Sequence, residues 1–349
     1  MRNRILVVAL VLVLVTLFNA TVAMAQDNQG SITGQVLNGT QEDAQLGADL
    51  EVVLITLDNG SPVSSSSTLT DDSGGFEFAD LSTTSAYAYF LTTVHQNTEY
   101  MSDLVQFDEA EVAKIVDVTV YDATSDENYS TSHIRVGMAH SVIHVQEESI
   151  FVEEFVSIIN DGNQTYMGSE EIPGSNGQLY ATLKFYLPSD VDMTTLQYVQ
   201  GIMGGRAFKQ SPGFVDTLPV IPGAKEIAYS YEIPFRTGNY TFDIRTNYHT
   251  SGVAILVQDN VGIADYSDQL IRGGSTEIPG EAERFTSYTA SNIGPNNLLA
   301  IELSRAPQDY QDVYKWIGLA FAFMAVIAPI AYVIAHKGRS KPVDVTDEQ

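Results

Sequence analysis

The chain has 349 residues, with 17 Lys and Arg against 44 Asp and Glu, and it contains no cysteine. The absence of cysteine excludes disulfides, thiolate zinc sites and a thiol nucleophile. A formal charge of −27 argues against nucleic-acid binding, which needs clustered Lys and Arg. The 44% hydrophobic content is that of a folded protein, and the length predicts two or three domains.

The first 25 residues predict a secretory signal peptide. Arg2 and Arg4 precede an apolar run from Ile5 to Leu14. The small-x-small sequence Ala23-Met24-Ala25 follows the run and predicts cleavage after Ala25. A retained N-terminal anchor is the alternative interpretation, although the run is short for a full membrane span.

Residues 26–123 are predicted to form a first β domain. Apolar residues alternate at period two, as in half-buried strands. The predicted strands are Ser31–Val36, Leu50–Leu57, Tyr87–Thr93 and Ile115–Tyr121. Between them, Thr70 to Leu81 reads TDDSGGFEFADL. Here Asp71 is expected to accept hydrogen bonds from turn amides, Gly75 to take a positive φ, and Phe76 and Phe78 to point to one face.

The order of these motifs resembles that of carboxypeptidase regulatory-like, or transthyretin-like, domains. Their pattern is a G-x-V strand, an apolar strand, T-D-x-x-G-x-F-x-F-x-x-L and an aromatic strand, and the likeness covers about residues 29–123. Gly39–Leu46 lengthens the first turn, and Ser82–Tyr87 replaces the usual Pro-Gly-x-Tyr. The resemblance implies a non-catalytic β-sandwich, an accessory or spacer module at cell surfaces, and it carries over no catalytic residue.

A polar segment at 124–131 is predicted to be a linker, and 132–310 a second β-sandwich region, as one large sandwich or two small ones. Its predicted strands include Phe151–Ile159, Leu179–Leu187, Glu226–Phe235 and Val253–Val257. The sequence Asn160-Asp161-Gly162-Asn163 predicts a hairpin turn. Tyr229 and Tyr231 are expected in the core, and binding of sugars or peptides by such rings is the alternative.

His140, His144 and Glu147 are the candidate metal ligands. His144 and Glu147 have the His-x-x-Glu spacing of metallocarboxypeptidases, with His249 as a possible third ligand. The long α/β catalytic domain of those enzymes is not predicted here. On a strand, His140 and His144 would lie about 13 Å apart. Separate structural roles for the two histidines are therefore favoured over a metal site, and no cofactor is predicted.

Residues 316–335 predict a transmembrane helix. The segment WIGLAFAFMAVIAPIAYVIA has no charge and is long enough to cross a 30 Å hydrocarbon core. Trp316 and Tyr332 lie near its ends, where such rings favour the membrane interface. Lys337, Arg339 and Lys341 follow directly, so the tail 336–349 is predicted to be cytoplasmic. The lipid bilayer is thus a predicted partner.

The acidity lies between the two apolar segments. Residues 26–314 contain eleven Lys and Arg against 41 Asp and Glu, a net charge near −30. Such a field keeps a secreted domain soluble. Cation binding is the alternative, but the acids are scattered and no EF-hand loop occurs.

The predicted fold is therefore all-β: a transthyretin-like β-sandwich, a larger β-sandwich region and one C-terminal transmembrane helix. No serine-hydrolase, P-loop or dinucleotide motif occurs. The predicted function is non-catalytic: a membrane-anchored extracytoplasmic protein for binding, scaffolding or envelope assembly, with a protein or glycan partner outside the cytoplasm. An accessory subunit of a membrane or periplasmic complex is the first alternative, and a metal-dependent hydrolase is the alternative of another class.

Overall fold

The computed structural model describes residues 29–42, 44–108, 111–198, 207–235, 238–259, 261–278 and 282–304. In these ranges the chain is almost entirely β, with one α-helix and one 3-10 turn, η1 (Gly39–Gln41), which confirms the all-β prediction. The predicted signal peptide 1–25, transmembrane helix 316–335 and tail 336–349 lie outside the described residues. Among the residues that are described, no helix has the length and hydropathy needed to cross a membrane.

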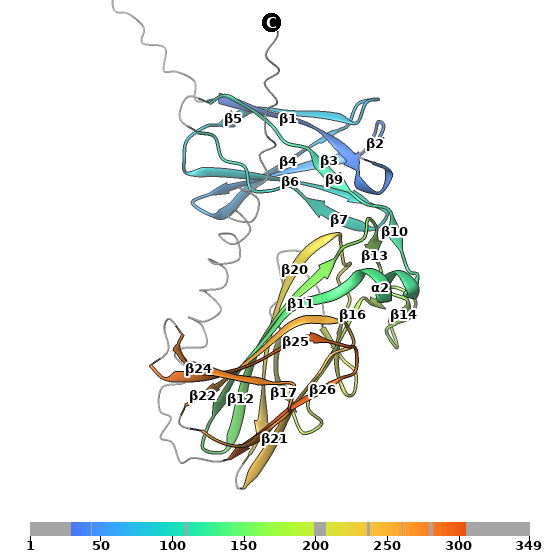
Figure 1. Ribbon diagram of the computed structural model, residues 1–349. Coiled ribbons are helices and arrows are strands. Elements are labelled where there is room, and N and C mark those ends of the chain that lie inside the picture. The colour runs from blue at the N-terminus through green and yellow to red at the C-terminus, as the bar shows by residue number, and fades with distance from the viewer. Residues whose placement is uncertain are drawn as a thin grey trace, which may run out of the picture. The chain divides into compact units, whose positions relative to one another are not determined.

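The chain divides into two compact units at Val120/Tyr121. The first unit has two sheets, which Figure 1 shows as two layers. In one sheet β1 pairs with β2 and β5 antiparallel and with β8 and β9 parallel. The other sheet has the order β4-β3-β6-β7. The strands are β1 (Gln29–Asn38), β2 (Ala44–Gln45), β3 (Glu51–Asp58), β4 (Ser61–Leu69), β5 (Gly75–Ser82), β6 (Tyr87–His95), β7 (Thr98–Met101), β8 (Ala113–Ile115) and β9 (Val118–Val120).

Alternate residues of both sheets form the core of the first unit, as the period-two pattern predicts. Phe76 and Phe78 are both buried, which confirms that they share the inner face of β5. The predicted strand Ile115–Tyr121, in contrast, is interrupted between β8 and β9. The Val116 carbonyl bends over Gly34, where an added Cβ would lie 1.9 Å from its oxygen. This close approach requires glycine in β1.

The turn before β5 forms around one carboxylate. Asp71 Oδ1 accepts hydrogen bonds from the Ser73 and Gly75 amides, both at 2.8 Å, and from Ser73 Oγ at 2.7 Å. These bonds confirm the predicted role of Asp71. The predicted positive φ at Gly75 is wrong, because Gly74 takes it, with a φ of 75°. The bond to Asp71 fixes Gly75 as the first residue of β5, so the chain reverses one residue earlier.

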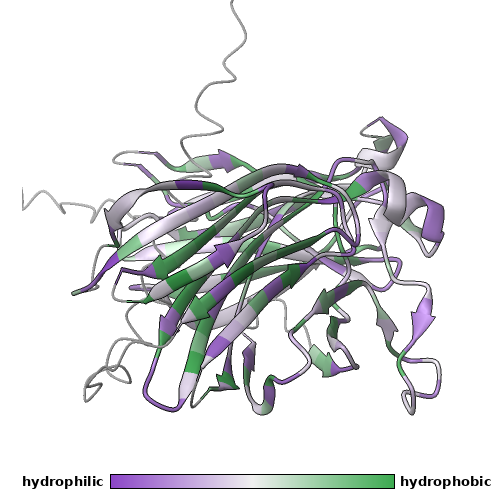
Figure 2. Cartoon of the chain, turned by 60° about the horizontal axis from the view of Figure 1, so that its bottom comes forward, coloured by the Kyte–Doolittle hydropathy of each residue, from purple (hydrophilic) through white to green (hydrophobic). Residues whose placement is uncertain are grey.

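The second unit is built on a seven-stranded sheet in the order β17-β20-β12-β11-β22-β25-β24. Only the β11–β22 pair within it is parallel. In Figure 2 hydrophobic and hydrophilic residues alternate along these strands. The strands are β11 (Ile134–Val145), β12 (Ser149–Asn160), β17 (Asp192–Tyr198), β20 (Gly223–Pro234), β22 (Thr250–Gln258), β24 (Ile271–Glu277) and β25 (Arg284–Ile293).

Two three-stranded sheets cover one face of this sheet, and an isolated bridge between Phe185 and Thr246 joins them. One continuous hydrophobic cluster lies between the layers, and it includes both Tyr229 and Tyr231. This confirms the predicted core position of the two tyrosines. The covering sheets are β16 (Leu183–Tyr186), β19 (Gly213–Asp216) and β18 (Ala207–Lys209), and β21 (Asn239–Arg245), β26 (Leu298–Ser304) and β23 (Gly262–Tyr266).

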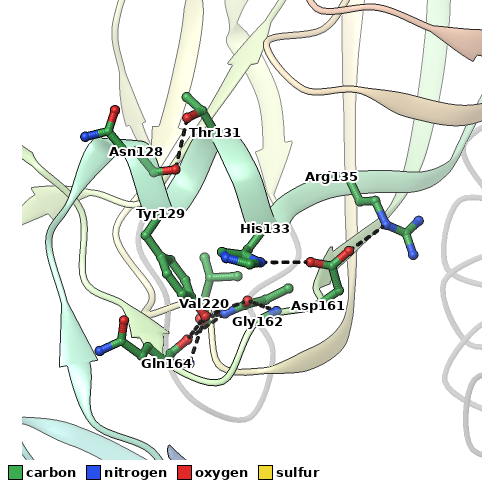
Figure 3. Close-up of polar contacts among 10 residues, drawn as sticks. Asn128, Tyr129, Thr131, His133, Arg135, Asp161, Gly162, Gln164 and Val220 are labelled. Atoms are coloured by element: carbon green, nitrogen blue, oxygen red, sulfur yellow. Dashed lines mark hydrogen bonds and ion pairs between the residues drawn. The ribbon is translucent and has the colours of Figure 1, made fainter.

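The segment 124–131, predicted to be a linker, contains most of the α-helix α2 (Glu127–His133). The Asp126 side chain caps it by accepting a hydrogen bond from the Asn128 amide. Tyr129 anchors the helix: its hydroxyl accepts from the Gln164 amide at 2.8 Å and donates to the Gln164 carbonyl at 2.7 Å (Figure 3). The polar residues of this segment therefore cap and cover a short helix.

The predicted hairpin turn at Asn160–Asn163 is also wrong. This turn leads from β12 to β13 (Thr165–Tyr166), which pairs with β10 (Ala123–Thr124) and not with β12. Asn160 is 2% exposed, and its Nδ2 donates to the carbonyls of Gln164 and Val220, both at 2.9 Å. The asparagine thus satisfies the backbone of two other segments. A second short pair, β14 (Glu170–Glu171) with β15 (Tyr180–Ala181), completes the unit.

Candidate functional site

The structure separates the candidate metal ligands. His144 lies buried on β11, whereas His140 on the same strand and Glu147 in the turn after it are exposed. No group of three or more His, Asp or Glu side chains in the described ranges is placed to hold a metal ion. His249 lies apart on the surface, with its Nε2 2.8 Å from Asn292 Oδ1.

His144 instead contacts Glu153, a residue that the sequence analysis did not single out. Its Nε2 lies 3.6 Å from Glu153 Oε2, and its ring packs edge-on against Phe285. Glu153 pairs in register with Ser230 of β20. Glu153 Oε1 and Ser230 Oγ are buried, and neither has a hydrogen-bond partner among the residues that the structure describes. The available signal was the Glu153-Glu154 pair within the predicted strand, because alternation must turn one of two adjacent acids inward.

Glu154 is the acid that points into the core between the two layers of the second unit. It is 6% exposed. Its Oε2 accepts a hydrogen bond from Ser141 Oγ at 2.7 Å, and its Oε1 accepts one from the Tyr231 hydroxyl at 3.1 Å. Burial raises the pKa of Glu154 to about 7, and these two hydrogen bonds oppose the rise.

A cavity of about 50 Å³ lies beside Glu154. Tyr229 and Tyr231 of β20 line its inner wall, and Lys184 of β16 and Arg245 of β21 line it from the covering sheets. Burial, followed by the charge of Glu154, raises the pKa of both tyrosines well above the ordinary value, so their hydroxyls stay protonated. A volume of this size has room for one or two water molecules but not for an organic substrate.

A second buried carboxylate, Asp216, ties the two layers of this unit together. It is fully buried on β19, and its Oδ2 accepts hydrogen bonds from Lys225 Nζ and the Tyr198 hydroxyl, both at 2.8 Å. Its Oδ1 accepts from the amides of Thr217 and Leu218. Four donors leave this carboxylate no capacity to act on a substrate, and its role is structural.

A larger concave surface lies on the first unit. It is an open groove of about 600 Å³ between the end of β4 and the outer face of β1, β5 and β8. Leu69 and Ile115 line it and are 58% and 83% exposed. Three carboxylates, those of Asp71, Glu77 and Asp117, also line the groove. Its surface is therefore acidic, with two exposed apolar side chains.

The first unit has almost no cations of its own to balance these carboxylates. Between residues 29 and 120 the sequence has fifteen Asp and Glu but a single Lys or Arg, which is Lys114. Lys114 Nζ is 2.6 Å from Glu111 and 3.7 Å from Asp108. Because this lysine is already paired, the groove can be neutralised only by a cation or a basic group from outside the unit.

No protein-family model matches the chain, and no curated protein sequence matches it. Among solved structures, the chain is similar over 81% of its length to the major pilin SpaD from Corynebacterium diphtheriae, at 9% identity, a TM-score of 0.22 and 88% coverage of that chain. It is similar over 82% of its length to the major pilin RrgB from Streptococcus pneumoniae, at 10% identity and a TM-score of 0.20, and spans 65% of that chain. TM-scores this low assign neither a fold nor a function.

Proposed function

We propose that this chain is a membrane-anchored extracytoplasmic protein that binds or scaffolds a partner and does not catalyse a reaction. The predicted signal peptide 1–25, the predicted transmembrane helix 316–335 and the strongly acidic segment between them support this location. The likeness of residues 29–123 to carboxypeptidase regulatory-like domains supports a spacer or binding role for the first unit.

The contrast between the two concave features carries the proposal. The cavity beside Glu154 has only about 50 Å³, and both oxygens of that carboxylate already accept hydrogen bonds from the sheet. The open groove of the first unit has about 600 Å³ and lies on a solvent-facing surface. An open surface of this kind suits a macromolecular partner better than a reaction that must exclude water.

Affinity purification of the full chain from membranes solubilised in mild detergent tests the binding role. We expect a protein or glycan to co-purify at a constant ratio, and we expect its recovery to fall when the groove carboxylates are neutralised by Glu77→Gln with Asp117→Asn. A matched control, Glu42→Gln with Asp103→Asn, removes the same charge from two exposed positions outside the strands and the groove. A purified chain that hydrolyses substrates and loses that activity with Glu154→Gln would contradict the proposal.

A further inference from the structure

Strand β4 leaves one side of its backbone unpaired. It is the end strand of the sheet β4-β3-β6-β7, and among the described residues it pairs only with β3. Its pairing with β3 is regular from Glu51↔Leu69 to Thr56↔Ser64, and the register shifts only beyond that point. Seen from solvent, β4 therefore presents six successive residues of regular strand, Ser64 to Leu69, with free backbone donors and acceptors on one edge.

Free edges of natural sheets are usually blocked by charges, prolines, bulges or a covering element. Strand β4 has a proline and a register shift only at its start, at Pro62. Its sequence, SPVSSSSTL, has no charged residue, and eight of its nine side chains are exposed, so the part from Ser64 to Leu69 is open to another strand. In the described part of the chain, every other edge strand of four or more residues carries such a charge: Glu77 in β5, Glu99 in β7, Lys184 in β16, Asp192 in β17, Asp243 in β21, Asp265 in β23 and Arg272 in β24.

The acidic groove lies at one end of this edge. Leu69, the last residue of β4, lines the groove together with Ile115. Asp71 and Asp117 each hold backbone amides through Oδ1, whereas Glu77 projects from the outer face of β5. An added strand running along β4 would therefore deliver its end to three carboxylates and two exposed apolar side chains.

Charge decides which kind of strand fits. Residues 29–120 of the first unit include fifteen acidic residues and one Lys or Arg, so a second copy of the chain would meet strong repulsion at this surface. Acids also flank β4 itself, with Asp58 before the turn into it and Asp71 and Asp72 after it. A segment with Lys or Arg at the end that reaches the groove would instead be attracted by these carboxylates.

We propose that β4 binds an extended segment of a partner protein as an added strand, with small or β-branched residues along β4 and a basic residue in the groove. Main-chain hydrogen bonds to the free edge supply the affinity, and the carboxylates set the direction and the preference for positive charge. This inference names the partner class and rests on the binding role proposed above.

Calorimetric titration of the full chain with synthetic peptides tests the inference. The probe is a capped peptide of alternating Thr and Val that ends in two Lys. We expect saturable binding that weakens with added salt, and an affinity loss of about fivefold or more when Gln replaces both Lys or when the protein carries Glu77→Gln with Asp117→Asn. The control variant Glu42→Gln with Asp103→Asn should bind within about twofold of wild type.

Two N-methylated versions of the peptide test strand addition itself without changing the protein. Alternate amides of an edge strand face its partner, so methyl groups on one alternate set should abolish binding and methyl groups on the other set should not. Equal binding of both versions would overturn the proposal, as would a concentration-dependent dimer of the chain that occupies β4. Absence of peptide binding while a partner still co-purifies would overturn this inference alone, and loss of both would overturn the binding role as well.

Discussion

Glu154 allows the internal structure of the second unit to be tested through pH. The folded protein raises the pKa of this carboxyl from 4.5 to about 7, because burial between the two layers disfavours its charge. The folded state therefore binds a proton more tightly than the unfolded state does. Stability falls as pH rises from about 4.5 towards 7, and it levels off above the folded pKa.

The size of the effect follows from the shift. A pKa difference of roughly 2.5 units at about 1.4 kcal/mol per unit amounts to ~3.5 kcal/mol over the whole range. Between pH 5 and pH 8 we expect the free energy of unfolding of wild type, relative to Glu154→Gln, to fall by about 2 to 3 kcal/mol. Gln resembles the protonated acid in shape and cannot ionise, so the other titrating groups cancel in the comparison.

Denaturant unfolding of both proteins, followed by near-ultraviolet circular dichroism of the tyrosines, measures this difference at each pH. Glu154→Ala is the second variant, because it also removes the ionisation but leaves a larger cavity, and it should be less stable at every pH. A difference between wild type and Glu154→Gln that does not change with pH would refute the assignment of Glu154 to a buried position between the layers.

Two further substitutions test packing that the fold requires. Gly34→Ala should destabilise the first unit by about 3 kcal/mol in thermal unfolding, because the added Cβ meets the Val116 carbonyl oxygen at 1.9 Å. The control Gly47→Ala, whose Cβ would meet nothing within 4 Å, should change stability by less than ~0.5 kcal/mol. Equal effects of the two substitutions would contradict the close approach of the Val116 carbonyl to β1. Asn160→Ala should lower the unfolding free energy of the second unit by about 3 kcal/mol, because it leaves buried backbone groups unpaired. The control Asn128→Ala, on the exposed side of α2, should have a small effect. Hydrogen exchange of the turn after β12 should become faster in Asn160→Ala only.

Local pattern was enough to predict the strands and some of their faces. The inward positions of Phe76 and Phe78 follow from alternation, and so does the burial of Tyr229 and Tyr231. The hydrogen bonds of Asp71 follow from its place before a Gly-Gly turn. These features depend on residues near one another in the sequence, so the sequence alone contains their causes.

Features that depend on distant segments could not be predicted in the same way. The break between β8 and β9 arises where a carbonyl approaches Gly34, more than eighty residues earlier in the chain. The turn after Asn160 looks like a hairpin until the partner of β13 is known. Alternation predicts that one acid of the Glu153-Glu154 pair points inward. It does not predict that both faces of β12 are covered at this point, so that both acids are buried. The spacing of His140 and His144 along one strand favoured separate roles for them, but it says nothing about what packs against each, so the contact between His144 and Glu153 could not be predicted.

The display of both β units outside the cytoplasm is tested most directly by protease treatment of intact cells that produce the chain with a C-terminal epitope tag. We expect external protease to remove the region 26–314 and to leave a short tagged fragment that is protected until the cells are lysed. A full-length chain that resists the protease on intact cells and is digested only after lysis would contradict the proposed location.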